Sequence, residues 1–350
     1  MKNVATILTS LLCLLSIQLL AQTDSINKKF TGIFPEGAIQ PRMRVIIDND
    51  FSGDPDGLFE LVHFLLSPSV DIRAVIGSHL PENNHTPSNH TATDSKSKAE
   101  EVLNIMNIGT SIPIYAGSND TLINKNTPQK SDAAIAIIKE AMRTDTQLPL
   151  YVVCGAGLTD IASAYLSEPK IADKLTLIWI GGPQYPGTLT SSVEASNLEY
   201  NMSIDLKAAQ VIFNQSSIPI WQVPRSSYSQ MIMPYSSILL KVKTQGKLGA
   251  YLANAIDSIR VLIKNFGFNT GEVYVIGDSP LVLLTALRSS FGNDPSSSEY
   301  MIRHCPVIND KGDYVFNKSG RNIKVFTHVD AHLTFEDFYS KLALFNQLQR

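Results

Sequence analysis

Aspartates gather directly after an apolar run near the start of the chain. Residues 45–47 are β-branched and apolar, which is typical of a buried strand. Asp48, Asp50, Asp54 and Asp56 follow within the next few positions. Carboxylates this close repel one another unless something neutralises them, and a hard divalent cation with oxygen ligands does so well. A solvated acidic turn is the alternative, but a strand rarely ends in several aspartates merely to turn. The pattern favours a cation site.

The elements around this acidic segment place it at the end of a sheet. Gly and Pro interrupt the segment and predict a loop, and the run LFELVHFLL with helical spacing follows. Strand, loop and helix in this order form the place where α/β enzymes bind ligands. Residues 148–166 repeat the order, and residues 271–287 combine an apolar stretch, an acidic turn and a helix. The C-terminal part, from YVFN to NIKVFTHV, predicts a hairpin before a final helix.

Strands and helices alternate throughout without a break in composition. We therefore expect an α/β fold with a single domain, built on a mostly parallel open sheet flanked by helices. The 350 residues are 44% hydrophobic and 17% charged, which is an ordinary globular balance. A formal charge of −3 without a basic cluster argues against a nucleic-acid partner.

The N-terminus has the layout of a secretory signal peptide. Lys2 precedes an apolar run that ends in a polar stretch, and cleavage after Ala21 fits this pattern. We expect a signal peptide over residues 1–21, a leader segment over 22–40 and the folded domain over 41–350. The apolar run is too short for a stable membrane span. These features predict an exported protein, either periplasmic or extracellular.

The mature chain retains two cysteines, Cys154 and Cys305. A single pair cannot form a disulfide framework, and nothing in the sequence brings the two together. We expect both to be small, buried, apolar residues.

Motifs along the chain, taken in order, resemble the nucleoside hydrolase family of the inosine-uridine preferring type. Residues 48–56, DNDFSGDPD, resemble the Asp-x-Asp-Pro-Gly-x-Asp-Asp loop of the family with one extra residue. Residues 155–162, GAGLTDIA, resemble its Gly-x-Leu-Thr-Asn-Ile-Ala turn, and residues 199–201, EYN, with Asp205 resemble its Glu-Phe-Asn motif. Residues 277–280, GDSP, match its His-Asp-Pro motif in part. Each motif alone is weak, but their shared order is specific.

The resemblance extends from Arg44 to the C-terminus and implies a calcium-dependent hydrolase. Such an enzyme cleaves the N-glycosidic bond of ribonucleosides to give ribose and free base. The implied Ca²⁺ ligands are Asp50, Asp56, Asp278 and the main-chain carbonyl of Cys154, all of which are hard oxygen donors. Asp50 is also the implied catalytic base, which takes a proton from the attacking water.

The same resemblance implies a sugar site. Asp54 matches the acidic residue that holds ribose hydroxyls, and Glu199 and Asn201 match further sugar contacts. Ser78 stands where the family often has an Asn in contact with the substrate. Asp48 is either a structural anchor for loop amides or a ligand. The implied partner is a small-molecule nucleoside or riboside, and a homo-oligomer is left open.

The chain departs from the family where the leaving base must receive a proton. Gly277 stands where many members have His, and the loop after residues 112–117 also lacks the usual His. The remaining candidates for a general acid are His79, Glu82, His85 and His90. Each of these, taken alone, is expected to be an exposed loop residue. His63 lies within an apolar helical run and is expected to be packed.

Three hypotheses follow from this departure. The first is a ribonucleoside hydrolase. The second keeps the sugar site but changes the leaving group, giving a hydrolase of another riboside or glycoside. The third is a noncatalytic calcium-dependent sugar-binding protein, which only a test of turnover separates from the others, because a shared fold does not decide function.

Overall fold

The computed structural model describes residue 34 and residues 37–81, 88–188, 198–265, 267, 269, 271–289 and 297–349. The predicted signal peptide and most of the predicted leader lie outside these residues. In the described part, no helix has the length and apolar character needed to cross a membrane.

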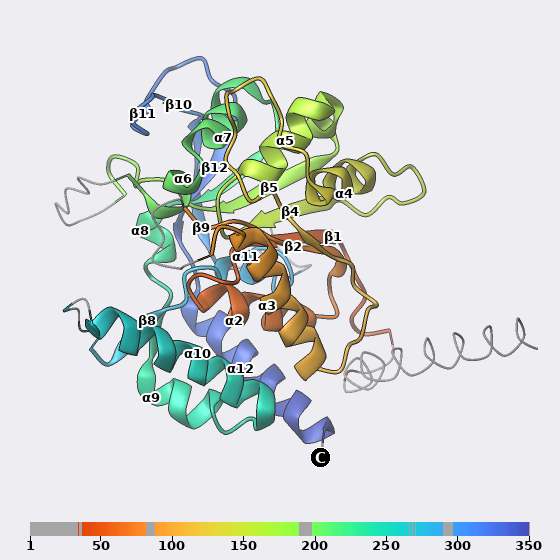
Figure 1. The fold of residues 1–350 in the computed structure, drawn as a ribbon, viewed down its shortest axis with the longest axis vertical. Coiled ribbons are helices and arrows are strands. Elements are labelled where there is room, and N and C mark those ends of the chain that lie inside the picture. Colours follow the sequence, from red (N-terminus) through yellow and green to blue (C-terminus); the bar gives the residue numbers. More distant parts are fainter. Residues whose placement is uncertain are drawn as a thin grey trace, which may run out of the picture.

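A parallel sheet forms the centre of the molecule (Figure 1). Its strands are β1 (Arg44–Asn49), β2 (Asp71–Gly77), β3 (Ile114–Ala116), β4 (Leu150–Cys154), β5 (Leu175–Ile180), β6 (Ile220–Val223), β9 (Glu299–His304) and β12 (Asn322–His328). The eight strands have the order β3-β2-β1-β4-β5-β6-β12-β9. Neighbours pair in parallel from β3 to β12, and β9 pairs antiparallel with β12 at the edge. The expected mostly parallel open sheet is therefore confirmed.

Helices cover both faces of the sheet. They are α2 (Asp56–Leu65), α3 (Thr91–Ile105), α4 (Asp132–Ala141), α5 (Thr159–Ser167), α6 (Tyr200–Ile204), α7 (Leu206–Gln210), α8 (Arg225–Tyr228), α9 (Tyr235–Ser237), α10 (Gly246–Asn265), α11 (Pro280–Leu283) and α12 (Ala331–Leu348). Short helical turns are Pro169–Asp173, Val211–Gln215 and Ile238–Val242. Figure 1 shows α2, α10 and α12 on one side of the sheet and α4, α5 and α7 on the other.

Two hydrophobic clusters follow from the alternation of side chains along each strand. Val45 and Ile47 of β1 belong to the cluster formed with α2, α10 and α12. Ile46, between them, belongs to the cluster formed with α4 and α5. Successive side chains of a strand point to opposite faces, so an apolar run such as β1 is buried on both sides.

Some pairings differ from those expected from the sequence. The predicted C-terminal hairpin is wrong, because β12 pairs with β9 and β6, while β11 (Tyr314–Val315) pairs with β10 (Val307–Ile308). The apolar stretch at 271–287 contributes β8 (Val273–Val275), which pairs with β7 (Ile232–Pro234) outside the main sheet. Short apolar runs form strands readily, but their partners depend on distant parts of the chain.

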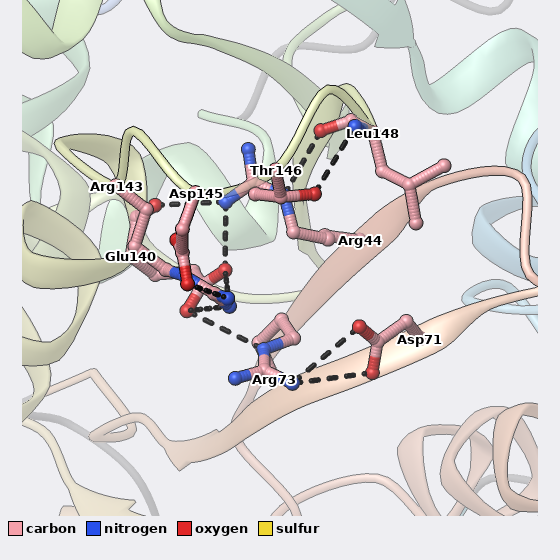
Figure 2. Close-up of polar contacts among 8 residues, drawn as sticks. All are labelled: Arg44, Asp71, Arg73, Glu140, Arg143, Asp145, Thr146 and Leu148. Carbon is pink, nitrogen blue, oxygen red and sulfur yellow. Dashed lines mark hydrogen bonds and ion pairs between the residues drawn. The ribbon is translucent and has the colours of Figure 1, made fainter.

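An ion-pair network fixes the amino end of β1 (Figure 2). The buried guanidinium of Arg44 lies 2.7 Å from Glu140 Oε1 on α4 and donates to the Leu148 carbonyl at 2.9 Å. Arg143 donates to the same Glu140 oxygen at 3.1 Å, and Arg73 Nε lies 3.4 Å from Oε2. Glu140 therefore joins β1, β2 and α4 at the end of the sheet opposite the acidic loop.

Candidate active site

The acidic loop lies where neighbouring parallel strands end side by side. In the register of the sheet, Asp48 of β1 is opposite Cys154 of β4. The amide of Gly155 donates to the Asp48 carbonyl at 3.0 Å, and the amide of Ser78 donates to the Asn49 carbonyl at 2.9 Å. The carboxyl ends of β1, β2 and β4 therefore form one edge, which is the usual ligand-binding edge of an open α/β sheet.

Asp278 joins this edge from a distant part of the sequence, just before α11. It is 4% exposed, and its Oδ2 accepts a hydrogen bond from Asn49 Nδ2 at 2.9 Å. A Cβ atom on Gly155 would lie only 2.7 Å from Asp278 Cγ, so the main chain after Cys154 passes close to this carboxylate. The structure thus places Asp278 beside the end of β1 and away from solvent.

The carboxylates of this region repel one another. Burial, together with repulsion by Asp278 and Asp54, raises the pKa of Asp50 well above its ordinary value. Burial and the same two neighbours also raise the pKa of Asp56. Burial raises the pKa of Asp278 to about 7, although the hydrogen bond from Asn49 partly offsets this effect. Simultaneous ionisation of these carboxylates is therefore unfavourable without a bound cation.

Donor chemistry and charge fit a calcium ion here. Carboxylate and main-chain carbonyl oxygens are the ligands that Ca²⁺ prefers, and a divalent cation would relieve the repulsion among the aspartates. Among the residues that the structure describes, however, no group of three or more His, Cys, Asp or Glu side chains is arranged to hold a metal ion. The ligand set Asp50, Asp56, Asp278 and Cys154 carbonyl stays a prediction.

Cys154 is buried, as expected. Its thiol donates to the Gly157 carbonyl at 3.2 Å, within its own turn, and burial raises its pKa. Cys305 is also buried, and both cysteines are free, so the expectation of two separate buried thiols is confirmed.

Two tyrosines orient the carboxylates that are expected to bind the sugar. The hydroxyl of Tyr274 on β8 donates to the exposed Asp54 carboxylate at 3.0 Å. The hydroxyl of Tyr228 on α8 donates to Glu199 Oε1 at 2.9 Å. Glu199 Oε2 accepts the Gly182 amide at 2.7 Å and also caps the amino end of α6. Both carboxylates are therefore held in defined positions.

Asn201 and Ser78 hold loops together at the same edge. Asn201 Nδ2 donates to the carbonyls of Gly155 at 3.0 Å and Ile180 at 2.8 Å. The Ser78 hydroxyl donates to Asp48 Oδ1, and in the described part of the chain the buried Asp48 Oδ2 has no partner. Asp48 thus binds a hydroxyl rather than the loop amides expected of an anchor. The sugar contacts of Asn201 and Ser78 stay predictions.

Gly277, which stands where many family members have a histidine, lies beside Asp56 and Tyr228. A Cβ atom on Gly277 would lie 3.2 Å from Asp56 Oδ2 and 3.4 Å from Tyr228 Cδ2. A Cβ atom here would require a small shift of the Asp56 carboxylate, whereas its distance to the tyrosine ring is an ordinary contact.

The candidate general acids fall in different environments. His79 is 3% exposed, so the expectation of an exposed loop residue is wrong for it. It follows β2, and its Nδ1 lies 3.0 Å from the Ser118 carbonyl oxygen. His90 is exposed directly before α3, while Glu82 and His85 lie outside the described residues. His63 is packed as expected, with its Nε2 2.7 Å from Asp337 Oδ2.

Sequence reasoning missed Tyr228, Tyr274, Asn49 and Glu60. The tyrosines carry no local signal, because each reaches its carboxylate across the fold. Asn49 and Glu60 did carry one: a polar residue between two aspartates, and an acidic residue inside an apolar helical run. Asn49 Nδ2 donates to Glu60 Oε2 at 2.6 Å, and both side chains are fully buried.

Comparison with known proteins gives a family. A family model described as inosine-uridine preferring nucleoside hydrolase matches residues 45–336. The inosine-uridine preferring nucleoside hydrolase of Crithidia fasciculata is 28% identical over 207 residues, which cover 51% of this chain and 58% of that protein. The match therefore spans little more than half the length of this relative.

Solved structures share the fold. The inosine-uridine preferring nucleoside hydrolase from Bacillus anthracis has a TM-score of 0.64 at 15% identity, covering 86% of this chain and 99% of that one. The purine-preferring ribonucleoside hydrolase from Gardnerella vaginalis has a TM-score of 0.66 at 16% identity, covering 87% and 99% respectively. At such identities the likeness shows a common architecture.

Proposed function

The chain belongs to the inosine-uridine preferring nucleoside hydrolase family, and on this premise we propose that it is a calcium-dependent hydrolase of ribonucleosides. The reaction cleaves the N-glycosidic bond and gives ribose and free base. One observation carries the proposal: Asp278 lies buried at the end of β1, and burial together with its charge raises the pKa values of Asp50 and Asp56. This concentration of negative charge supports a cation and a developing positive charge on a sugar.

Positive charge develops on the ribose when the N-glycosidic bond breaks, because the transition state resembles an oxocarbenium ion. Carboxylates placed beforehand near that charge stabilise it without having to reorganise. Asp54 and Glu199 are suited to this role and to binding ribose hydroxyls, since Tyr274 and Tyr228 hold them in place.

Asp50 is the proposed general base. It would take a proton from the water that attacks the sugar. Calcium, when bound by Asp50, Asp56, Asp278 and the Cys154 carbonyl, supplies a positive charge that acidifies water and orients the sugar hydroxyls.

The surroundings of Gly277 favour a second candidate. Without a histidine at this position, the nucleobase would have to depart unprotonated, and in that form it is a poor leaving group. A hydrolase of another riboside, whose leaving group is already acidic, would not need that proton. The observation that supports this alternative is that Gly277, beside Asp56 and Tyr228, provides no side chain that could donate the proton.

The proposal extends to the cell compartment. Residues 1–21 have the pattern of a signal peptide, so we propose that residues 41–350 act in the periplasm or outside the cell. An exported hydrolase of this kind would act on nucleosides before uptake.

Product analysis tests the proposed function. The protein is incubated with inosine and calcium, and free ribose and hypoxanthine are quantified together. We expect equal amounts of both products, and we expect EGTA to stop their release. Base release without ribose, or release unaffected by EGTA, would contradict a calcium-dependent hydrolytic cleavage.

A further inference from the structure

The side chain of Asn49 lies among the residues that are proposed to bind calcium. Its Oδ1 accepts the amide of Asp50 at 2.8 Å, and its Nδ2 donates to Asp278 Oδ2 at 2.9 Å. Asn49 is fully buried. Two of the proposed ligands are therefore bound to the same carboxamide.

Two glycines allow the main chain to pass close to this carboxamide. A Cβ atom on Gly57 would lie 2.9 Å from Asn49 Nδ2, and one on Gly155 would lie 2.4 Å from the same atom. Gly57 directly follows Asp56, and Gly155 directly follows Cys154. The backbone beside the other two proposed ligands thus packs against Asn49, in space that a side chain at either glycine would fill.

Glu60 adds to the bonds that set which way the carboxamide faces. Its Oε2 accepts the second hydrogen of Asn49 Nδ2 at 2.6 Å, so the two amide hydrogens serve two carboxylates. A flipped amide would turn its oxygen towards both carboxylates and its hydrogens towards the Asp50 amide. Glu60 is fully buried, and within the described residues its Oε1 has no partner. A buried carboxyl with an unsatisfied oxygen lowers stability, which points to another role.

We propose that Asn49 is the positioning residue of the cation site and that Glu60 holds it in the required orientation. This inference rests on the proposed function for the identity of the ligands. Asn49 fixes the direction of the Asp278 carboxylate and the course of the main chain at Asp50, Asp56 and Cys154. Partners that orient metal ligands in this way commonly contribute about 10- to 100-fold in metal affinity.

Substitutions at Glu60 separate positioning from simple stability. Glu60→Leu leaves one Asn49 amide hydrogen without an acceptor, but it also removes a buried carboxyl from an apolar helix, so the calcium-free protein should melt close to the wild-type temperature. Its calcium affinity should nevertheless fall about 10- to 100-fold. Glu60→Gln keeps an oxygen that can accept the hydrogen bond and should stay within a few-fold of wild type. A residue with a purely structural role would change stability and affinity together.

Asn49→Leu removes all three hydrogen bonds of the carboxamide and should weaken calcium binding at least as much as Glu60→Leu. Asn214→Leu is the matched control. Asn214 makes two hydrogen bonds of 2.9 Å to the main chain of Ile308, away from the acidic loop. The control should leave calcium affinity unchanged.

The experiment is calorimetric titration of CaCl₂ into EGTA-stripped protein, with melting curves recorded without calcium. Weakened binding in Asn49→Leu and Glu60→Leu, but not in Glu60→Gln or Asn214→Leu, supports the inference. If Asn49→Leu and Glu60→Leu both bind calcium as tightly as the wild-type protein, the inference is overturned and the proposed function stays intact. No binding by the wild-type protein would overturn both this inference and the calcium dependence. If Asn49→Leu does not fold, the two Glu60 variants decide the outcome.

Discussion

At the scale of single residues, the proposal gives Asp50 the role of base. The Asp50→Asn side chain keeps an oxygen that can bind a cation, but it is too weak a base to take the proton from the attacking water. Turnover should therefore fall by about 10²- to 10⁴-fold. The measurement is kcat on whichever riboside is hydrolysed, with circular dichroism to confirm the fold. Wild-type turnover in a folded variant would show that Asp50 is not the base.

Asp54 and Tyr274 should affect binding more than chemistry. Asp54→Ala removes the expected contact to ribose hydroxyls and should raise KM more than it lowers kcat. Tyr274→Phe removes the hydroxyl that donates to Asp54 at 3.0 Å and should have a smaller effect in the same direction. Tyr165→Phe, which loses a hydrogen bond of 3.1 Å to Gln215, is the matched control. If KM is unchanged in Asp54→Ala, the sugar must be held elsewhere.

Sequence reasoning was effective for residues close to strand ends and weak for their supports. Asp278 lies beside the end of β1, and the acidic turn that contains it can be recognised in the sequence, while its role as a calcium ligand stays a prediction. Tyr228 and Tyr274 were not predictable, since their carboxylate partners are far away in the sequence. His79 was expected in an exposed loop, but its position directly after a buried strand carries it inside.

At the scale of elements, the network around Glu140 should maintain stability without affecting the site. Glu140→Gln weakens its pairs with Arg44, Arg73 and Arg143, and Arg44 is nearly buried. We expect a loss of about 1–3 kcal/mol in the free energy of unfolding, because a buried charge loses its partner.

Urea unfolding measures this loss. Glu101→Gln is the control, because Glu101 pairs with Lys98 at the surface, where an ion pair contributes little. Calcium affinity should be unchanged in both variants, since Glu140 lies at the opposite end of the strands. Equal stability of the two variants would show that the Glu140 network is not important for the fold.

The order of elements was predictable because parallel strands and their helices alternate in sequence. The pairing of β12 with β9 was not, because the mixed sequence EYMIRH of β9 carries no clear strand pattern, while the apolar pair YV of β11 lies nearer in the sequence. The helix α3 begins with Thr91 directly after a polar loop, where composition alone gives no clear boundary. Local pattern therefore predicts which segments become strands, whereas tertiary packing selects their partners.

At the scale of the whole molecule, calcium should determine how stability depends on pH. The folded pKa of Asp278 is raised to about 7, and those of Asp50 and Asp56 are also raised above the ordinary value. A raised folded pKa gives stability that is present at low pH and lost as pH rises through the folded value.

The calcium-free protein should therefore melt at a lower temperature as pH increases from about 4 to about 7, between the ordinary carboxyl pKa and the folded pKa of Asp278. Saturating calcium, which binds only the folded state, should raise the melting temperature most at the upper end of this range. Differential scanning fluorimetry in EGTA and in CaCl₂ measures both. A melting temperature that rises with pH in EGTA would contradict the clustering of these carboxylates.

The most direct test of the account as a whole compares ribose release from inosine, uridine and p-nitrophenyl riboside by the calcium-bound protein. A hydrolase that lacks the usual histidine should release ribose from all three substrates. Release from p-nitrophenyl riboside should be faster by about 10²-fold or more. A missing general acid lowers the rate only when the leaving group needs a proton, and p-nitrophenolate does not. Equal rates on the three substrates would show that another residue protonates the base. Ribose binding without release from any of them would contradict the hydrolase and leave a calcium-dependent sugar-binding protein.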